Sequence, residues 1–296
     1  MHAYLSAIGF SGISSNRAIN CVVEEVVERY DRKTIFHSED GRLMAEYAKL
    51  FAKNCGVGVC GELDDIGDFH PEYYFPFYQG REVSVREEVT LECQTFREAY
   101  EGALDDNRVN ITLIFFLTNM GEYRSLMDRS AVYPGKKPVI FSAPAMDGTV
   151  ILPVRKNEKL EKIRRRDELQ RKKLVNAARD GDEDAIESLT MADLDTYSAI
   201  SQRLVREDIL SIVESYIMPC GVECDQYNIL GTIQRIEMTR NIVTGDRLYQ
   251  LVVECNDILI SVCINTRDLL GVPEVGRRFK GRVWLQGQVL FQDTLR

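Results

Sequence analysis

The chain has 296 residues, of which 45% are apolar and 28% charged, and its formal net charge is −9. This length accommodates two folded domains, and the composition is typical of a globular protein. Residues 1–155 carry 16 cationic and 23 anionic side chains, 156–224 carry 12 and 15, and 225–296 carry 9 and 8. An acidic chain of this kind is a poor general binder of polyanions, because phosphate contacts need clustered cations. Nucleic-acid contact would be local to the last third or to the basic stretch after residue 155.

No apolar run reaches the roughly 18 residues that a membrane-spanning helix needs. The opening MHAYLSAIGFSGI lacks the basic segment and long apolar core of a signal peptide. Eight cysteines in a chain of this size are typical of reduced thiols packed as small apolar side chains. We therefore expect a cytoplasmic protein with no membrane partner and no cofactor.

Residues 1–155 are predicted to form an α+β domain with a mainly antiparallel sheet. Residues 1–10 read as a short strand, and Ser14 or Ser15 then caps a helix that runs to Tyr30. Turn dipeptides predict three hairpins, which pair 34–37 with 43–50, 73–78 with 83–93, and 139–142 with 149–154, while 56–63 forms a glycine-rich strand. Thr95 and Glu98 form a capping box for a further helix. Residues 109–117 are apolar on both faces, which predicts a central strand.

Residues 156–224 are predicted to form a helical connector that begins basic and turns acidic. Asp180-Gly181 ends its first helix, and Pro219 ends its last one. The spacing of Ile209, Ile212, Val213 and Tyr216 is that of one helix face packed on a domain. We expect this packing to hold the flanking domains in a fixed arrangement.

Residues 225–296 are predicted to form a small five-stranded β-barrel similar to the OB fold, with an SH3-like barrel or a meander as alternatives. The expected strands are 229–240, 248–256, 258–265, 279–285 and 288–291, with an insertion at 267–271. Alternation of apolar side chains is clean in the third strand and around Gly281 in the fourth.

Three stretches carry a resemblance to a known family. They are MHAYLSAIGFS at the start, MPCGVECDQY (218–227) and GRRFKGRVWLQG (276–287). Together they resemble a family of uncharacterised proteins of anaerobic Gram-positive bacteria, classed as a domain of unknown function. The resemblance spans nearly the whole chain and implies a soluble intracellular protein, and it carries no catalytic residues.

Metal binding has one weak candidate, Cys220 and Cys224, because a zinc site needs two close pairs of ligands and no second close pair follows. Cys255 and Cys263 occupy alternating positions on neighbouring predicted strands, which fits packing inside the barrel better than metal binding. The sequence contains no catalytic motif: GxSxG, HExxH and a phosphate-binding loop are all absent. Its histidines are His2, His37 and His70. We expect no catalytic residues, and an enzyme is the third choice.

Two features favour nucleic-acid binding. Arg277, Arg278, Lys280 and Arg282 cluster beside Trp284, the single tryptophan, and barrels of this kind bind single strands through cations and stacking aromatics. The basic run at 162–173 is the second feature. The alternation of the cations also fits a solvated strand face, and the basic run can pair with the acidic run that follows it.

A non-catalytic interaction or adaptor protein is the first hypothesis, with a protein partner or self-association, and nucleic-acid binding through the barrel is the alternative. Two β-rich domains, a charged connector and an acidic surface support the first hypothesis. The third hypothesis, an enzyme, predicts a concave pocket with converging polar groups.

Overall fold

The computed structural model describes residues 3–13, 15–94, 98–106, 108–109, 111–128, 135–153, 213–221 and 224–291, with isolated residues between 174 and 210. The chain divides into two compact units. The first combines residues 1–152 with 215–296, and the second holds 153–214. The first unit contains all the sheets described below, so strands from the two ends of the sequence share one core. This division differs from the three consecutive segments that the sequence predicts.

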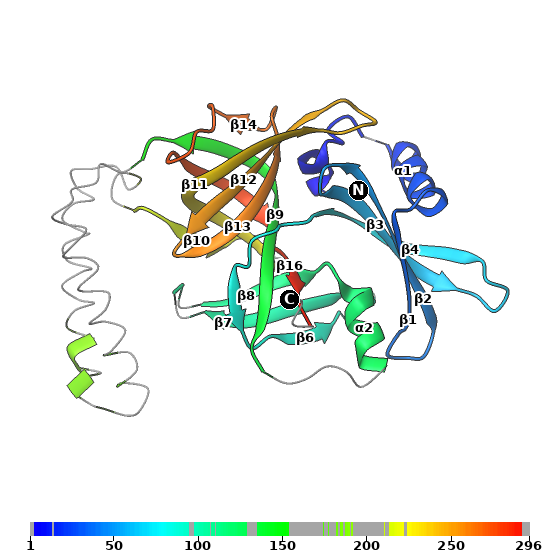
Figure 1. The fold of residues 1–296 in the computed structure, drawn as a ribbon, viewed down its shortest axis with the longest axis horizontal. Helices are drawn as coiled ribbons and strands as arrows, with labels where there is room; N and C mark the ends of the chain where they lie inside the picture. Colours follow the sequence, from blue (N-terminus) through cyan, green and yellow to red (C-terminus); the bar gives the residue numbers. More distant parts are fainter. Residues whose placement is uncertain are drawn as a thin grey trace, which may run out of the picture. The chain divides into compact units, whose positions relative to one another are not determined.

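A four-stranded antiparallel sheet is built from strands in chain order (Figure 1). Its strands are β1 (Arg32–His37), β2 (Leu43–Ala52), β3 (Cys55–Leu63) and β4 (Phe69–Tyr78). The predicted first hairpin and the glycine-rich strand are confirmed. Gly58 in β3 leaves room for Phe75, since a Cβ at this position would lie 2.4 Å from the Phe75 ring. The glycine therefore lets an aromatic ring of β4 lie directly over β3.

Helix α1 (Asn16–Glu28) covers this sheet, and it begins where the sequence predicts. Its N-cap is Ser15, whose Oγ accepts the amide hydrogen of Ala18 at 3.2 Å. Ile19, Val22 and Val26 are buried in a cluster with residues of β2 and β3. Before it lies η1, a 3-10 helix (Ala3–Ile8), where the sequence predicts a strand. That prediction was wrong because η1 buries side chains three residues apart, which suits a 3-10 turn.

The second sheet has twelve strands, ordered β10-β11-β12-β13-β9-β16-β8-β7-β6, with β5, β14 and β15 paired off this path. Its strands are β5 (Val85–Glu87), β6 (Thr90–Cys93), β7 (Tyr100–Asp106), β8 (Ile111–Leu117), β9 (Lys137–Ile151), β10 (Tyr216–Pro219), β11 (Gln226–Arg240), β12 (Arg247–Cys255), β13 (Ile258–Asn265), β14 (Leu269–Leu270), β15 (Arg278–Trp284) and β16 (Gln286–Val289). The predicted central strand is β8, which lies between β16 and β7.

Strand β9 is central to this sheet: the strand order places it between β13 and β16, and Figure 1 shows it as a long green strand that passes both. It pairs with β5, β13, β14, β15 and β16. The sequence predicts a hairpin here, turning at Asp147-Gly148, and that prediction was wrong. Gly148 serves packing and not a turn, since a Cβ there would lie 2.5 Å from the ring of Phe279 and 2.8 Å from Ile264.

The predicted fold class, α+β with a separate C-terminal OB-like barrel, is corrected by this arrangement. The described part of the protein is mostly β, with 53% of the described residues in strands and two large sheets. The five C-terminal strands lie close to their predicted bounds, but among the described residues they form no clear closed barrel. They are joined instead to the strands of the first half, because β9 pairs with β13, β15 and β16. Alternation within a strand does not reveal the partner on its far edge.

Two further predictions for the first half were wrong. No hairpin turns at Gln79-Gly80, because β5 pairs with β9 and β6 pairs with β7. The predicted helix from Thr95 lies partly outside the described residues, and its second half is strand β7, in which Tyr100, Leu104 and Asp106 are buried in alternation. Tertiary pairing outweighs the local capping signal there. Helix α2 (Met120–Asp128) packs against β1 and was not predicted.

Most of the predicted helical connector, including Ile209 and Ile212, lies outside the described residues. Where the chain returns to the first unit, the structure corrects the prediction: Tyr216 lies in strand β10 and not on a helix face. Ile217 is buried and pairs with Ile229 of β11, which explains the extended backbone. No helix in the described part is long and apolar enough to cross a membrane.

Candidate functional site

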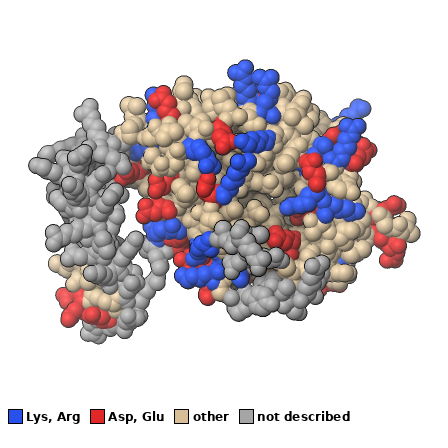
Figure 2. Space-filling model, viewed as in Figure 1, with Lys and Arg blue, Asp and Glu red and all other residues tan. Residues whose placement is uncertain are grey.

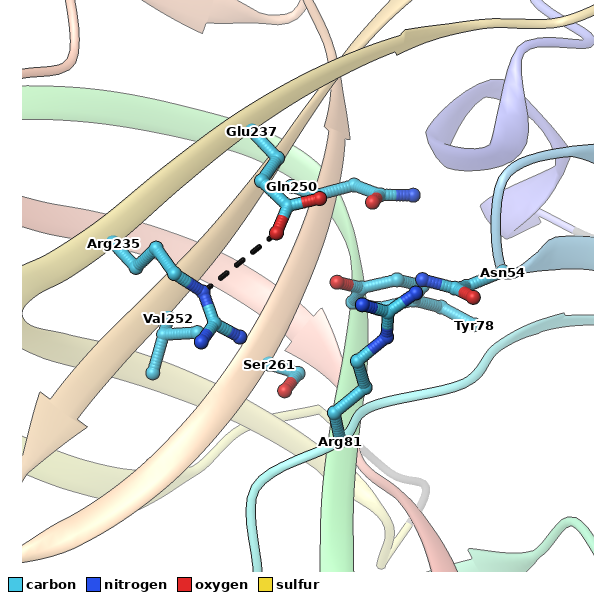
Figure 3. Close-up of a pocket in the computed structure, with 8 residues that line it drawn as sticks. All are labelled: Asn54, Tyr78, Arg81, Arg235, Glu237, Gln250, Val252 and Ser261. Carbon is cyan, nitrogen blue, oxygen red and sulfur yellow. Dashed lines mark ion pairs between the residues drawn. The ribbon is translucent and has the colours of Figure 1, made fainter.

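A polar pocket opens within the first unit where the β2–β3 hairpin and the end of β4 meet strands β11, β12 and β13. It encloses about 270 Å³, including space open to solvent. The lining residues are Asn54, Tyr78, Arg81, Arg235, Glu237, Gln250, Val252 and Ser261 (Figure 3). They come from both sheets, so the pocket exists only because the two sheets pack together.

The rim on the side of the four-stranded sheet is held by backbone contacts. Asn54 occupies the turn between β2 and β3 with a φ of 59°, a left-handed conformation that asparagine tolerates well. Its carbonyl accepts the amide hydrogen of Gln79 at 2.8 Å, which fastens the hairpin turn to the end of β4. Tyr78, the last residue of β4, pairs with Cys55 of β3.

The floor comes from two neighbouring strands of the twelve-stranded sheet. Val252 of β12 pairs with Ser261 of β13, and Gln250 pairs with Cys263. The Gln250 amide donates a hydrogen bond to the Lys53 carbonyl, and it lies 3.3 Å from Cys55 Sγ. This side chain therefore joins the floor to the hairpin turn, and the pocket keeps its shape through contacts between sheets.

The pocket lining holds two arginines and one glutamate, so positive side chains are in excess. Arg235 lies 2.7 Å from Glu82 and 3.8 Å from Glu237, and Lys53 contacts Glu237 at 2.6 Å. Arg81 is exposed, and it has no ion pair with any described residue. Figure 3 shows it reaching in from the loop after β4, across from Arg235. The pocket therefore presents one surplus cation in a chain of net charge −9.

Two hydroxyl groups add hydrogen-bond donors beside this cation. Tyr78 is 7% exposed, and burial raises the pKa of its phenol well above the usual value. The phenol therefore keeps its proton at neutral pH and can donate it. Ser261 is also buried and lines the same space. An anion in the pocket would meet a guanidinium group, a phenol, a hydroxyl group and the Asn54 amide.

The predicted nucleic-acid residues do not form one exposed surface. Trp284 is 4% exposed, donates from Nε1 to Asp225 Oδ2 at 2.5 Å, and packs its ring against Phe116 and Tyr4. A buried ring of this kind offers no face for a base to stack on. Arg278 is likewise 4% exposed and donates to the Leu152 carbonyl at 3.0 Å.

The other predicted cations lie at the surface. Arg277 lies 2.8 Å from Glu274, Arg282 lies 3.7 Å from Asp147, and Lys280 is exposed between them. Figure 2 shows basic and acidic side chains interspersed over the face in view, without one continuous basic stripe. The candidate interface thus has one exposed lysine and two arginines with carboxylate neighbours.

The two candidate metal ligands lie near the turn that joins β10 to β11. Cys220 is half-buried, and Cys224 is exposed. Burial raises the pKa of the Cys220 thiol, which disfavours the thiolate that binds metals. Within the described residues, no group of three or more histidine, cysteine, aspartate or glutamate side chains is placed to hold a metal ion.

None of the pocket residues was a candidate in the sequence. They stand in four separate stretches, at 54, 78–81, 235–237 and 250–261, and none of these contains a ligand-binding motif. The one usable signal was Asn54 itself, because an asparagine between two predicted strands marks a tight turn at a sheet end.

The family was identified from the sequence as a whole. The family model described as "Domain of unknown function, E. rectale Gene description (DUF3881)" matches residues 5–287. The chain belongs to this family. The resemblance to an uncharacterised family of anaerobic Gram-positive bacteria is thereby confirmed. No curated protein and no solved structure matches the chain.

Proposed function

We propose that this protein is a non-catalytic binding protein, and that its pocket receives a carboxylate group of a protein partner. The observation that carries the proposal is Arg81, an exposed guanidinium group without an ion pair among the described residues, at a pocket lined by hydroxyl and amide donors. A planar guanidinium group pairs with a carboxylate through two parallel hydrogen bonds. The cytoplasmic location remains part of this proposal, supported by eight cysteines with free thiols.

The size of the pocket favours a single functional group over a whole small molecule. Sites for drug-sized ligands enclose roughly 300–1,000 Å³ and are lined mainly by apolar side chains. The 270 Å³ of this pocket counts open solvent, its enclosed part is about the size of one water molecule, and Val252 is its one aliphatic lining residue. A carboxylate oxygen of an aspartate, a glutamate or a C-terminus of a partner can occupy the open mouth, whereas a whole small molecule cannot be enclosed.

The lining residues support binding more than catalysis. Ser261 has no histidine or cysteine beside it in the lining, and the one lining carboxylate, Glu237, is neutralised by Lys53 at 2.6 Å. General acid–base catalysis needs a base within hydrogen-bond reach of the group that it activates. A self-associating copy could supply the carboxylate as well as a different protein could. Nucleic-acid contact through 277–282 stays a prediction that needs its own test.

The test compares two exposed arginines of the same region. Succinate is titrated into the wild-type protein and into the Arg81→Ala and Arg86→Ala variants, with binding followed by amide NMR shifts. Arg86, in β5, is exposed and does not line the pocket, so both variants lose one positive charge. We expect roughly tenfold weaker binding for Arg81→Ala, the loss of a charge-assisted hydrogen bond, and no change for Arg86→Ala.

Neutral succinamide and inorganic phosphate complete the experiment at matched ionic strength. The proposal requires that succinamide fails to shift the amides of Asn54 and Ser261. Stronger shifts with phosphate than with succinate would assign the pocket to phosphate groups and reject a carboxylate. Equal losses in the two arginine variants would mean that only the general surface charge matters.

A further inference from the structure

Two cysteine thiols from distant parts of the sequence meet in the core of the first unit. Cys55 begins β3 and Cys263 lies in β13, 208 residues later, yet their sulfur atoms are 3.3 Å apart. Both residues are fully buried. The pair spans the contact between the four-stranded and the twelve-stranded sheet, so a covalent bond there would join the two sheets.

The two sulfurs belong to a short line of hydrogen bonds. The Gln250 amide donates to Cys55 Sγ at 3.3 Å, Cys55 and Cys263 share a hydrogen bond, and Cys263 Sγ donates to the Ala7 carbonyl at 3.2 Å. These bonds hold both sulfurs in place in the reduced protein. A disulfide needs a sulfur separation of about 2.05 Å, so the two atoms must approach by roughly 1.3 Å.

The pair lies directly behind the polar pocket. Tyr78 pairs with Cys55, Gln250 pairs with Cys263, and both Tyr78 and Gln250 line the pocket. Asn54, another lining residue, precedes Cys55 in the chain. The pocket is therefore an opening from which a small, polar reagent could reach the sulfurs when these side chains move.

We propose that Cys55 and Cys263 form a reversible disulfide when the protein meets hydrogen peroxide, and that this bond locks the two sheets together. One thiolate attacks a peroxide oxygen, which yields a sulfenic acid and releases hydroxide. The second thiol then attacks that sulfur and expels its oxygen as water. In sum, two thiols and one peroxide molecule give one disulfide and two water molecules; the two cysteines lose two electrons, which the peroxide gains.

The environment of the pair sets the speed of this reaction. Burial raises the pKa of the Cys263 thiol well above the usual value, so the reactive thiolate is scarce at neutral pH. We therefore expect oxidation over minutes to hours and faster oxidation at higher pH. Cys60 and Cys255 are also buried, and burial raises the pKa of each thiol. Among the described residues, however, neither Cys60 Sγ nor Cys255 Sγ has another cysteine within hydrogen-bond distance.

The experiment uses the full chain with Cys21 and Cys224 replaced by serine, because these two cysteines are exposed and would react first. Six cysteines then remain of the eight in the sequence. The folded protein is treated with hydrogen peroxide, quenched, unfolded and alkylated, and its intact mass and peptides are measured. We expect four alkylated thiols, a mass loss of two hydrogens, one linked peptide pair joining Cys55 to Cys263, and full reversal by dithiothreitol.

Variants separate the pair from cysteines in general. Cys263→Ala should yield no linked peptide that contains Cys55 after peroxide treatment, whereas Cys60→Ala, another buried site, should still form the peptide that joins Cys55 to Cys263. The disulfide should also raise the melting temperature by on the order of 5 °C, because it closes a long loop in the unfolded chain.

Two outcomes would overturn the proposal without any variant. One is that six thiols of the folded Cys21→Ser/Cys224→Ser protein remain alkylatable after peroxide. The other is a linked peptide that joins a different pair, such as Cys60 with Cys255. Either result would mean that the short sulfur distance reflects packing of two thiols alone.

Discussion

Glu46 and Asp246 are both buried carboxylates, one in each half of the core, and their surroundings differ. Glu46, in β2, is 2% exposed; Arg32 donates to its Oε1 at 2.7 Å, and its Oε2 has no partner in hydrogen-bonding geometry. Asp246, before β12, accepts hydrogen bonds from Ser11 Oγ at 2.5 Å and from Asn265 at 3.1 Å.

These surroundings move the two pKa values in opposite directions. Burial raises the pKa of Glu46 above its ordinary 4.5, and the Arg32 charge offsets this only in part. Burial alone would raise the pKa of Asp246 too, but hydrogen bonds from Ser11 and Asn265 and the charge of Arg267 outweigh it, so the pKa falls below the ordinary 3.8. Glu46 lies deeper in the protein and Asp246 has more donors, and the depth of burial and the number of donors together decide whether the folded state favours the charged form.

We expect the greatest loss of stability when the counter-charge of Glu46 is removed. Arg32→Ala should destabilise the protein by about 3 kcal/mol at pH 7, because it leaves a buried carboxylate without its counter-charge. Glu46→Gln should cost less than about 1 kcal/mol, and the double variant should recover most of the loss. Urea unfolding of the three variants measures this. Additive losses in the double variant would contradict the coupling.

The same pair predicts a dependence on pH. The folded chain holds the Glu46 proton at pH values where the unfolded chain has released it. Its contribution to stability is therefore complete below pH 4.5 and is lost as the pH rises through the folded-state pKa. The cost of Arg32→Ala should shrink when unfolding is measured at pH 4.5 in place of pH 7, since Glu46 is then protonated.

Asp246 should behave in the opposite way. Asp246→Asn should cost about 2 kcal/mol at pH 7, because hydrogen bonds to a charged acceptor are replaced by weaker ones. The contribution of Asp246 is present above pH 3.8 and is lost as the pH falls through the lower, folded-state pKa. The difference between wild type and variant in urea unfolding should therefore narrow at acid pH. A constant difference would show that packing, and not charge, accounts for the loss.

A third carboxylate, Asp64, lies in an ion pair at the surface, and we expect its partner to change the stability least of all. His70 lies 3.0 Å from Asp64, which raises the pKa of His70, while His70 lowers that of Asp64. His70 is exposed and Asp64 is partly exposed, and an ion pair in contact with water contributes little to stability. His70→Ala should leave the urea midpoint unchanged at pH 5.5 and at pH 8. A measurable loss at pH 5.5 alone would give this surface pair a structural role.

Local sequence signals predicted the elements that depend on nearby residues. Ser15 marks the start of α1, Asp40-Gly41 marks the first hairpin, and strict alternation marks β13. In each case the partner of the signal lies within a few residues, so the free energy that stabilises the element is visible in a short window. The four-stranded sheet is built in this way from strands in chain order.

No local sequence signal predicted the residues of the candidate site. Tyr78 and Arg81 stand in one stretch and Ser261 in another, and they acquire a common role only when the two sheets pack together. For Trp284 and Arg278 the sequence pattern pointed the other way. A cluster of cations beside an aromatic residue predicted an exposed binding surface, but the fold buries both of these side chains. Burial depends on which strand covers a face, and alternation alone does not specify that strand.

The sequence alone was enough to predict the family, the five C-terminal strands, the first helix and the first hairpin of the four-stranded sheet, because each depends on local chemistry or on matching residues along the chain. Only the tertiary structure decided that β9 is one long strand, that it joins the two ends of the chain, and that Cys55 meets Cys263. These features rest on contacts between residues more than a hundred positions apart, whose free energy is gained only when the distant segments come together.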